Sequence, residues 1–133
     1  MIGASVETAA KWLLEGEVVG IPTETVYGLA ACIYHPDAVQ RIFAVKNRPV
    51  SNPLILHIAS IDDLIPLVSE MPPQALQLAE ACWPGPLTMI FPRSERVGDM
   101  ITGGQPTVAI RIPAHPLTLD LLKTVKEPLA APS

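Results

Sequence analysis

The chain has 133 residues, which is enough for one domain with a sizeable core. Hydrophobic residues make up 49% and charged residues 17% of the chain, a balance that excludes a disordered segment. The net charge of −4 argues against a protein coated for non-specific nucleic-acid binding, although it is compatible with one local basic cleft.

Apolar periodicity and capping residues predict alternating helices and strands along the first half of the chain. A helix is predicted over 5–15, capped by Ser5 and ended by Gly16, and a second helix over 36–45. Strands are predicted at 18–21 and 54–58, and loops at 23–28 and 46–53.

The second half continues the same alternation. Ser60 and Asp63 resemble a capping box and predict a short helix. Further helices are predicted at 73–82 and 116–124, strands at 87–91, 107–112 and 129–131, a rigid turn at 83–86 and a polar loop at 93–106. This order favours an α/β fold with flanking helices and some parallel strand pairs.

Two features indicate the setting of the domain. Cys32 and Cys82 lie far apart without metal-ligand spacing, so we expect neither a disulfide framework nor a metal site, and a reducing cytoplasm fits better. No signal peptide or membrane-spanning run is recognisable. We expect one domain over 1–133 whose C-terminal part is missing, because the chain stops directly after an apolar run.

The loop from Lys46 to Asn52 is a candidate phosphate site. Lys46 and Arg48 place two cations on a stiff, Pro-containing loop, and an arginine fork can grip a phosphate with two bonds. Asn52 adds an amide that can donate and accept hydrogen bonds. The alternative is a helix C-terminus decorated with cations that offset its dipole.

A second candidate follows the first predicted strand, at Pro22–Leu29. Ligands of open α/β sheets bind beyond the carboxyl ends of strands, so the hydroxyl of Thr25 could bind a small polar substrate there. The alternative is an ordinary threonine-rich turn.

His57 and Arg111 each lie within a predicted strand. A lone histidine in a buried strand is more often a satisfied core residue than a catalyst. A buried guanidinium needs an anionic partner, which could be Glu24, Asp120 or a substrate carboxylate. Thr107 and Ser133 are single hydroxyls at strand ends and are weak signals by themselves.

The chain resembles the YrdC-like family, and within it the bacterial threonylcarbamoyladenylate synthases. The resemblance is carried by five segments in the family's order, Pro22–Leu29, Lys46–His57, Trp83–Thr88, Thr107–Pro116 and Leu129–Ser133. The family's next motif residues would follow Ser133, where this sequence ends.

The resemblance implies a nucleotidyltransferase that condenses L-threonine, bicarbonate and ATP to threonylcarbamoyl-AMP and pyrophosphate, for a tRNA modification. It implies an open twisted mixed or parallel sheet with a concave basic face. Lys46 and Arg48 would be the catalytic cations, and Mg²⁺ would bind through the ATP phosphates. ATP would contact Arg48, Asn52, Thr107 and Ser133, and threonine would contact Thr25, His57, Arg111 and Ala131.

Three other interpretations compete with this one. The first is a non-catalytic module that binds tRNA or double-stranded RNA, which the acidic net charge and the few aromatic residues disfavour. The second is a carbamoyl-transfer domain of the hydrogenase-maturation type, which the two cysteines disfavour. The third is a scaffold domain without chemistry. Other tRNA-modification proteins are possible partners, and no membrane partner is expected.

Overall fold

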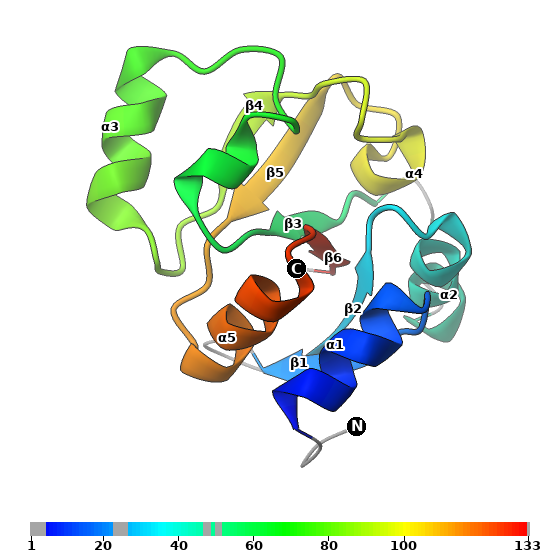
Figure 1. Cartoon of the computed structure of the whole chain (residues 1–133). Coiled ribbons are helices and arrows are strands. Elements are labelled where there is room, and N and C mark those ends of the chain that lie inside the picture. Colours follow the sequence, from blue (N-terminus) through cyan, green and yellow to red (C-terminus); the bar gives the residue numbers. More distant parts are fainter. Residues whose placement is uncertain (1–4, 23–26, 47–48, 50–51, 133) are drawn as a thin grey trace.

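The computed structural model describes residues 5–22, 27–46, 49 and 52–132, with side chains for all of these except Tyr27 and Lys46. In chain order the elements are α1 (Val6–Leu14), β1 (Val19–Pro22), β2 (Tyr27–Cys32), α2 (Pro36–Lys46), β3 (Ile55–His57), η1 (Ile61–Leu64, a 3₁₀ helix), α3 (Pro73–Cys82), β4 (Met89–Pro92), α4 (Asp99–Thr102), β5 (Thr107–Arg111), α5 (Pro116–Val125) and β6 (Leu129–Ala131). Figure 1 shows them in space.

The six strands form one sheet in the order β1-β2-β6-β3-β5-β4. Among the described strands, β3 and β5 pair in parallel and the other four neighbouring pairs are antiparallel. The α/β class and the mixed sheet predicted from the sequence are therefore confirmed, with less parallel pairing than the alternation of helices and strands suggested. The reason is that β1–β2 is a hairpin and β6 runs against both of its neighbours.

The sequence-based element prediction missed two features. Residues 27–32 form β2, although 23–28 was predicted as a loop and no strand was assigned to the residues after it. The alternation of small residues in this strand lacks the bulky β-branched side chains on which the prediction relied. The predicted loop 93–106 also contains the one-turn helix α4, ended by Gly103 in the left-handed conformation.

The helix caps follow the sequence closely. The hydroxyl of Ser5 accepts a hydrogen bond from the N–H of Thr8 at 3.1 Å, and Gly16 ends the first helix with φ +90°. At the start of η1, the Asp63 carboxylate accepts a bond from the N–H of Ser60 at 3.1 Å. These local bonds set the helix boundaries that the sequence predicted.

The sheet separates two apolar cores. On one face, residues such as Leu56 and Ile110 pack with α2, η1 and α3. On the other face, Leu129 and Ala131 pack with α1 and α5, which lie side by side in Figure 1. We call the first face A and the second face B.

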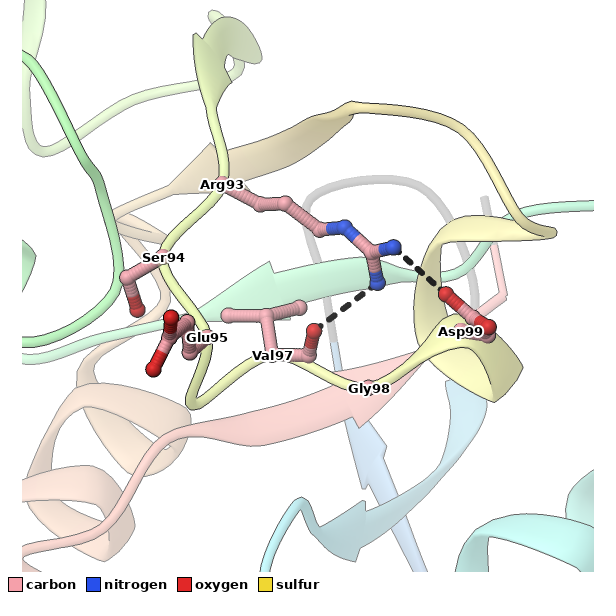
Figure 2. Close-up of a pocket in the computed structure, with 6 residues that line it drawn as sticks. All are labelled: Arg93, Ser94, Glu95, Val97, Gly98 and Asp99. Atoms are coloured by element: carbon pink, nitrogen blue, oxygen red, sulfur yellow. Dashed lines mark hydrogen bonds and ion pairs between the residues drawn. The ribbon is translucent and has the colours of Figure 1, made fainter.

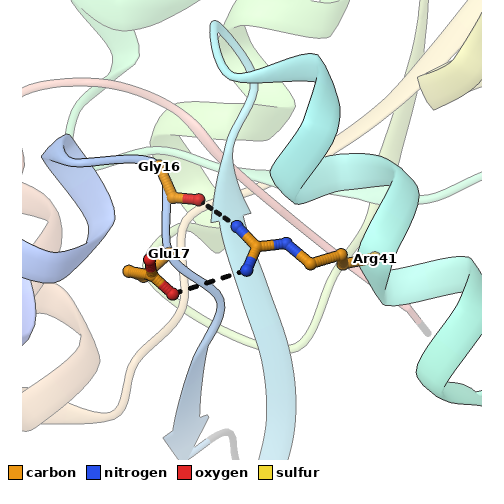
Figure 3. A network of polar contacts seen from close by, with 3 residues as sticks. All are labelled: Gly16, Glu17 and Arg41. Carbon is orange, nitrogen blue, oxygen red and sulfur yellow. Dashed lines mark hydrogen bonds and ion pairs between the residues drawn. The ribbon is translucent and has the colours of Figure 1, made fainter.

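An arginine ties α2 to the turn between α1 and β1. The Arg41 guanidinium donates to the carbonyl oxygen of Gly16 at 2.5 Å and lies 3.4 Å from the Glu17 carboxylate, as Figure 3 shows. Its side chain is half exposed, so the ion pair itself contributes little to stability.

Within the described part of the chain, no helix is long and apolar enough to cross a membrane.

Candidate functional site

Strand pairing brings His57 and Arg111 together. They are direct register partners in the parallel pair of β3 and β5, and each is the last residue of its strand. The carboxyl ends of parallel strands meet at the same edge of a sheet, which is where ligands of open α/β sheets bind. On the other side of His57, Leu129 of β6 completes the row.

Helices cover only part of face B. Leu129 and Ala131 are buried under α1 and α5, whereas the positions further along the sheet are not. Thr107 is exposed, Ala109 is partly exposed, and Ile90 on the edge strand β4 is 62% exposed. The residues of face B on β3, β4 and β5 are called the open face and are Ile55, His57, Ile90, Pro92, Thr107, Ala109 and Arg111.

The exposure of side chains differs along the open face: His57 is buried, Arg111 is partly exposed and Thr107 is exposed. His57 is 2% exposed and pairs with Leu129 of β6, which is buried in the face B core with residues of α1 and α5. Arg111, one strand further on, is partly exposed as a residue, although its Nε atom is buried. A cation at the border between a buried core and an open surface suits an anionic group that approaches from solvent.

The structure places the other predicted site residues as follows. Ala131 is buried in β6, and its register partner is Ile55 of the open face. Asn52 is exposed, and its backbone N–H donates to the carbonyl of Pro49 at 3.0 Å. Lys46 is the last residue of α2. Thr25, Arg48 and Ser133, together with the side chain of Lys46, lie outside the described residues.

Arg41 belongs to a different part of the molecule from the open face. The sequence places it within eight positions of Lys46 and Arg48. Its guanidinium is directed to the Gly16 carbonyl and Glu17, so this cation joins two backbone segments.

One described pocket, of about 440 Å³, is lined by the loop between β4 and α4. Figure 2 shows its lining, with the Arg93 guanidinium donating to the Val97 carbonyl at 2.9 Å and to the Asp99 carboxylate at 2.5 Å. Of the predicted site residues that the structure describes, none lines it. The bonds of Arg93 hold the loop before α4 in place.

Titration behaviour and metal-binding groups add little to the candidate site. Burial, with a smaller effect of the Glu127 charge, raises the pKa of Cys32 to about 12. Cys32 lies under the helices of face B, and a thiol that stays protonated is a poor nucleophile. Among the described residues, no three His, Cys, Asp or Glu side chains are grouped so that they could hold a metal ion.

Residues 11–133 match the sequence profile of the Sua5/YciO/YrdC family, described as telomere recombination. The chain is 51% identical over 128 residues to a threonylcarbamoyl-AMP synthase of Pyrococcus abyssi, covering 96% of this chain and 38% of that protein. It is 36% identical to a protein of the same name from Vibrio campbellii, covering 96% of this chain and 70% of that one. The chain therefore belongs to the Sua5/YciO/YrdC family, as the sequence motifs predicted.

Solved structures agree on the fold. A structure of P. abyssi Sua5 complexed with L-threonine superposes with a TM-score of 0.93 at 51% identity, over 96% of this chain and 38% of that one. Escherichia coli YciO gives a TM-score of 0.85 at 23% identity, over 96% of this chain and 62% of that one, which supports the fold alone. The chain spans less than two fifths of the lengths of the P. abyssi and Bacillus subtilis relatives.

Proposed function

We propose that this chain is the substrate-binding domain of an L-threonylcarbamoyladenylate synthase. The observation that carries the proposal is the row of His57 and Arg111 at the carboxyl ends of two parallel strands, beside the open face. A relative that is 51% identical to this chain was solved with L-threonine, which supports threonine as the ligand of this row. The relatives named threonylcarbamoyl-AMP synthase support the reaction.

The open face suggests how two substrates would be arranged. His57 and Arg111 stand in one row across β3 and β5, and Thr107 stands on the same face, four residues back along β5. In this proposal threonine binds at the His57 row, with Thr25 and the backbone at Ala131 as further contacts. ATP binds towards Thr107, with Arg48, Asn52 and Ser133 as its other ligands. The reacting groups would then meet over the open face.

The proposed reaction has two bond-forming steps. The neutral amine of threonine attacks carbon dioxide, derived from bicarbonate, and loses a proton to give a carbamate. A carbamate oxygen then attacks the α-phosphorus of ATP, and the bond to the β-phosphate breaks to release pyrophosphate. Negative charge is spread over phosphate oxygens in this step, so the protein contributes mainly positioning and fixed cations.

Lys46, the last residue of α2, and Arg48, two positions further along the chain, are the proposed cations, because two fixed positive charges can neutralise phosphate oxygens. Mg²⁺ would bind together with ATP, through the phosphate oxygens, an arrangement that requires few or no protein ligands.

The cytoplasm is the proposed location. The proposed partners are tRNA and other tRNA-modifying proteins, which would use the product.

The experiment is a pyrophosphate-release assay with ATP, bicarbonate and L-threonine, paired with calorimetry of L-threonine binding. We expect release to require all three substrates. Arg48→Ala should lower the rate by about 10²–10³-fold, equivalent to roughly 2–4 kcal/mol of transition-state stabilisation. Arg96→Ala, which removes an exposed arginine from the loop before α4, is the control and should leave the rate unchanged.

Two results would contradict the proposal. A protein that binds no L-threonine, with or without ATP, is not a synthase of this kind. Salt-sensitive tRNA binding without any threonine-dependent release of pyrophosphate would favour the RNA-binding alternative.

A further inference from the structure

The turn between α3 and β4 has no role in the proposed function, although its sequence is distinctive. It runs Trp83-Pro84-Gly85-Pro86-Leu87, so that a proline restricts the backbone on either side of Gly85. The indole of Trp83 is buried in the face A core, and its Nε1–H donates a hydrogen bond to the carbonyl oxygen of Leu87 at 2.7 Å. This bond closes the turn on itself, with Gly85 inside the closed segment.

The closed turn is fastened to the end of β5. The Gly85 N–H donates to the carbonyl oxygen of Ile112 at 2.9 Å, and Figure 1 shows the connection after α3 running beside the end of β5. Pro113 follows Ile112 and has no backbone N–H, so the strand cannot continue its hydrogen-bond ladder there. The bond from the turn therefore holds β5 at the point where its ladder stops.

This contact lies one residue beyond Arg111, the last residue of β5. The carbonyl oxygen of Arg111 accepts a hydrogen bond from the N–H of Ile58 at 3.1 Å, on the side of β3. Successive carbonyl groups of a strand point to opposite sides, so the next one, that of Ile112, meets the turn instead. The chain just after Arg111 is thus held from both sides, which sets the direction in which the arginine side chain leaves the sheet.

That direction matters because a guanidinium is planar. Its two parallel N–H groups grip a carboxylate only when the fork and the carboxylate share a plane. The Nε atom of Arg111 is buried, so the guanidinium follows the backbone closely. A lysine ammonium is a point charge on a flexible stem and would tolerate the same backbone shift.

We propose that Trp83 is a positioning residue for the threonine subsite, because its indole closes the turn that fixes the backbone beside Arg111. The inference rests on the proposed function, in which Arg111 is a threonine ligand. Trp83 packs in the face A core, whereas Arg111 belongs to the open face. Trp83 therefore does not touch the substrate and acts through Gly85 and Ile112.

The test begins with Trp83→Phe, which keeps a buried aromatic ring and removes the N–H that closes the turn. Calorimetry should show that L-threonine binds roughly three- to tenfold more weakly, the scale of one hydrogen bond. The Kd for ATP should not change, because Thr107, the proposed ATP ligand on β5, lies at the other end of that strand.

A double-mutant cycle shows whether the effect passes through Arg111. Arg111→Lys keeps the charge and removes the fork. In this background Trp83→Phe should weaken threonine binding by less than about twofold, because the flexible ammonium does not depend on the turn. Titration followed by NMR measures all four Kd values, including values in the millimolar range.

The chain offers two matched controls. Trp12→Phe makes the same change at the other tryptophan, on α1, and should bind threonine normally. Ile42→Val trims the face A core on α2 and controls for a general loss of stability. If Trp83→Phe does not fold, Pro86→Gly takes its place, since it loosens an exposed part of the turn without removing buried surface, and the same pattern is expected.

The outcomes separate this inference from the proposed function. If the unsubstituted protein binds threonine and Trp83→Phe (or Pro86→Gly) binds it equally well, the positioning role is overturned and the function stands. Equal losses with arginine and with lysine at position 111 would also overturn the role, because the effect would then bypass Arg111. The same holds if ATP affinity falls as much as threonine affinity. If the unsubstituted protein binds no threonine, both the function and the role fail.

Discussion

Cys32 shows what burial does to one ionisable side chain. It is fully buried in the face B core, and burial raises the pKa of its thiol to about 12, with a smaller contribution from Glu127. Cys82, at the end of α3, is exposed. The two cysteines should therefore differ sharply in reactivity, because the thiolate is the reactive form.

We expect a thiol reagent at pH 8 to modify Cys82 rapidly and Cys32 only when the protein unfolds. Because the folded-state pKa of Cys32 is raised, its effect on stability is neutral below the unfolded pKa of about 8.5. Stability is then lost as the pH rises from there towards 12, since only the unfolded state releases the proton. Counting modified thiols in native and unfolded protein checks this, with Cys82→Ser as control. Rapid modification of two thiols in the native state would contradict it.

For single residues, the sequence predicted burial in part, but it did not predict which residues lie side by side. His57 was expected to be buried within a strand and is, while Arg111 was expected to be buried and is partly exposed. Their adjacency could not be predicted from the sequence alone, because it depends on the register of two strands separated by more than 50 residues. The hydrogen bond from the Thr118 hydroxyl to the Pro22 carbonyl could not be predicted either, because the two residues lie 96 positions apart.

Gly85 is required by a close contact in the connection between α3 and β4. A Cβ atom at this position would stand 2.7 Å from the carbonyl oxygen of Cys82, closer than real Cβ atoms approach. The Gly85 N–H also donates to the Ile112 carbonyl at 2.9 Å, which fixes the chain just after Arg111. The tight turn and the end of β5 are therefore linked.

We expect Gly85→Ala to destabilise the protein by about 1–3 kcal/mol, because the new methyl group forces the backbone apart. Gly98→Ala is the matched control, since a Cβ there would meet nothing within 4 Å. Urea unfolding of both variants gives the comparison. Equal stability of the two variants would show that the turn relaxes without cost.

The open face has an alanine between two isoleucines. Ala109 is the register partner of Ile55 on one side and Ile90 on the other. Neighbouring side chains in such a row stand about 5 Å apart, and the alanine side chain extends less far from the sheet than its two isoleucine neighbours. In the proposed site Ala109 lies between the His57 row and Thr107.

We expect Ala109→Leu to place a bulky side chain where the substrates are proposed to meet and to weaken binding of both by at least about tenfold, with little change in stability because the position is partly exposed. Ala44→Leu, at an exposed position of α2, controls for added apolar surface. Calorimetry with threonine and with ATP measures the effect. Unchanged affinities would place the substrates elsewhere.

At the element scale, helices with strong caps were predicted well and the hairpin was not. Helix α3 matches its predicted bounds because Pro73 starts it and the Trp83–Pro84 pair ends it. Strand β2 was missed because its core residues are mostly small, so it carries little periodic signal. The direction of each strand depends on tertiary pairing, so the sequence predicted a mixed sheet with some parallel pairing but not that β3 and β5 are the strands that pair in parallel.

For the whole molecule, the sheet acts as a partition. Alternate residues of one strand enter different cores, so that Leu56 packs on face A while His57 beside it turns to face B. Leu129, on the neighbouring strand, belongs to the face B core. Two residues that are neighbours in the sequence can therefore pack in different cores. Face A supplies much of the core, and part of face B is left uncovered for a site.

Double substitutions test that partition. Leu56 and Ile110 are register partners on face A, whereas Leu56 and Leu129 lie on neighbouring strands but on opposite faces. Each change to valine should cost about 1 kcal/mol. We expect Leu56→Val and Leu129→Val to add within about 0.5 kcal/mol, and Leu56→Val and Ile110→Val to deviate from additivity by more than that, because the latter pair shares one packed layer. Urea unfolding of the single and double variants measures both couplings. Strong coupling across the sheet would mean that backbone shifts pass from one core to the other, and substitutions on face A would then be expected to disturb the threonine row as well.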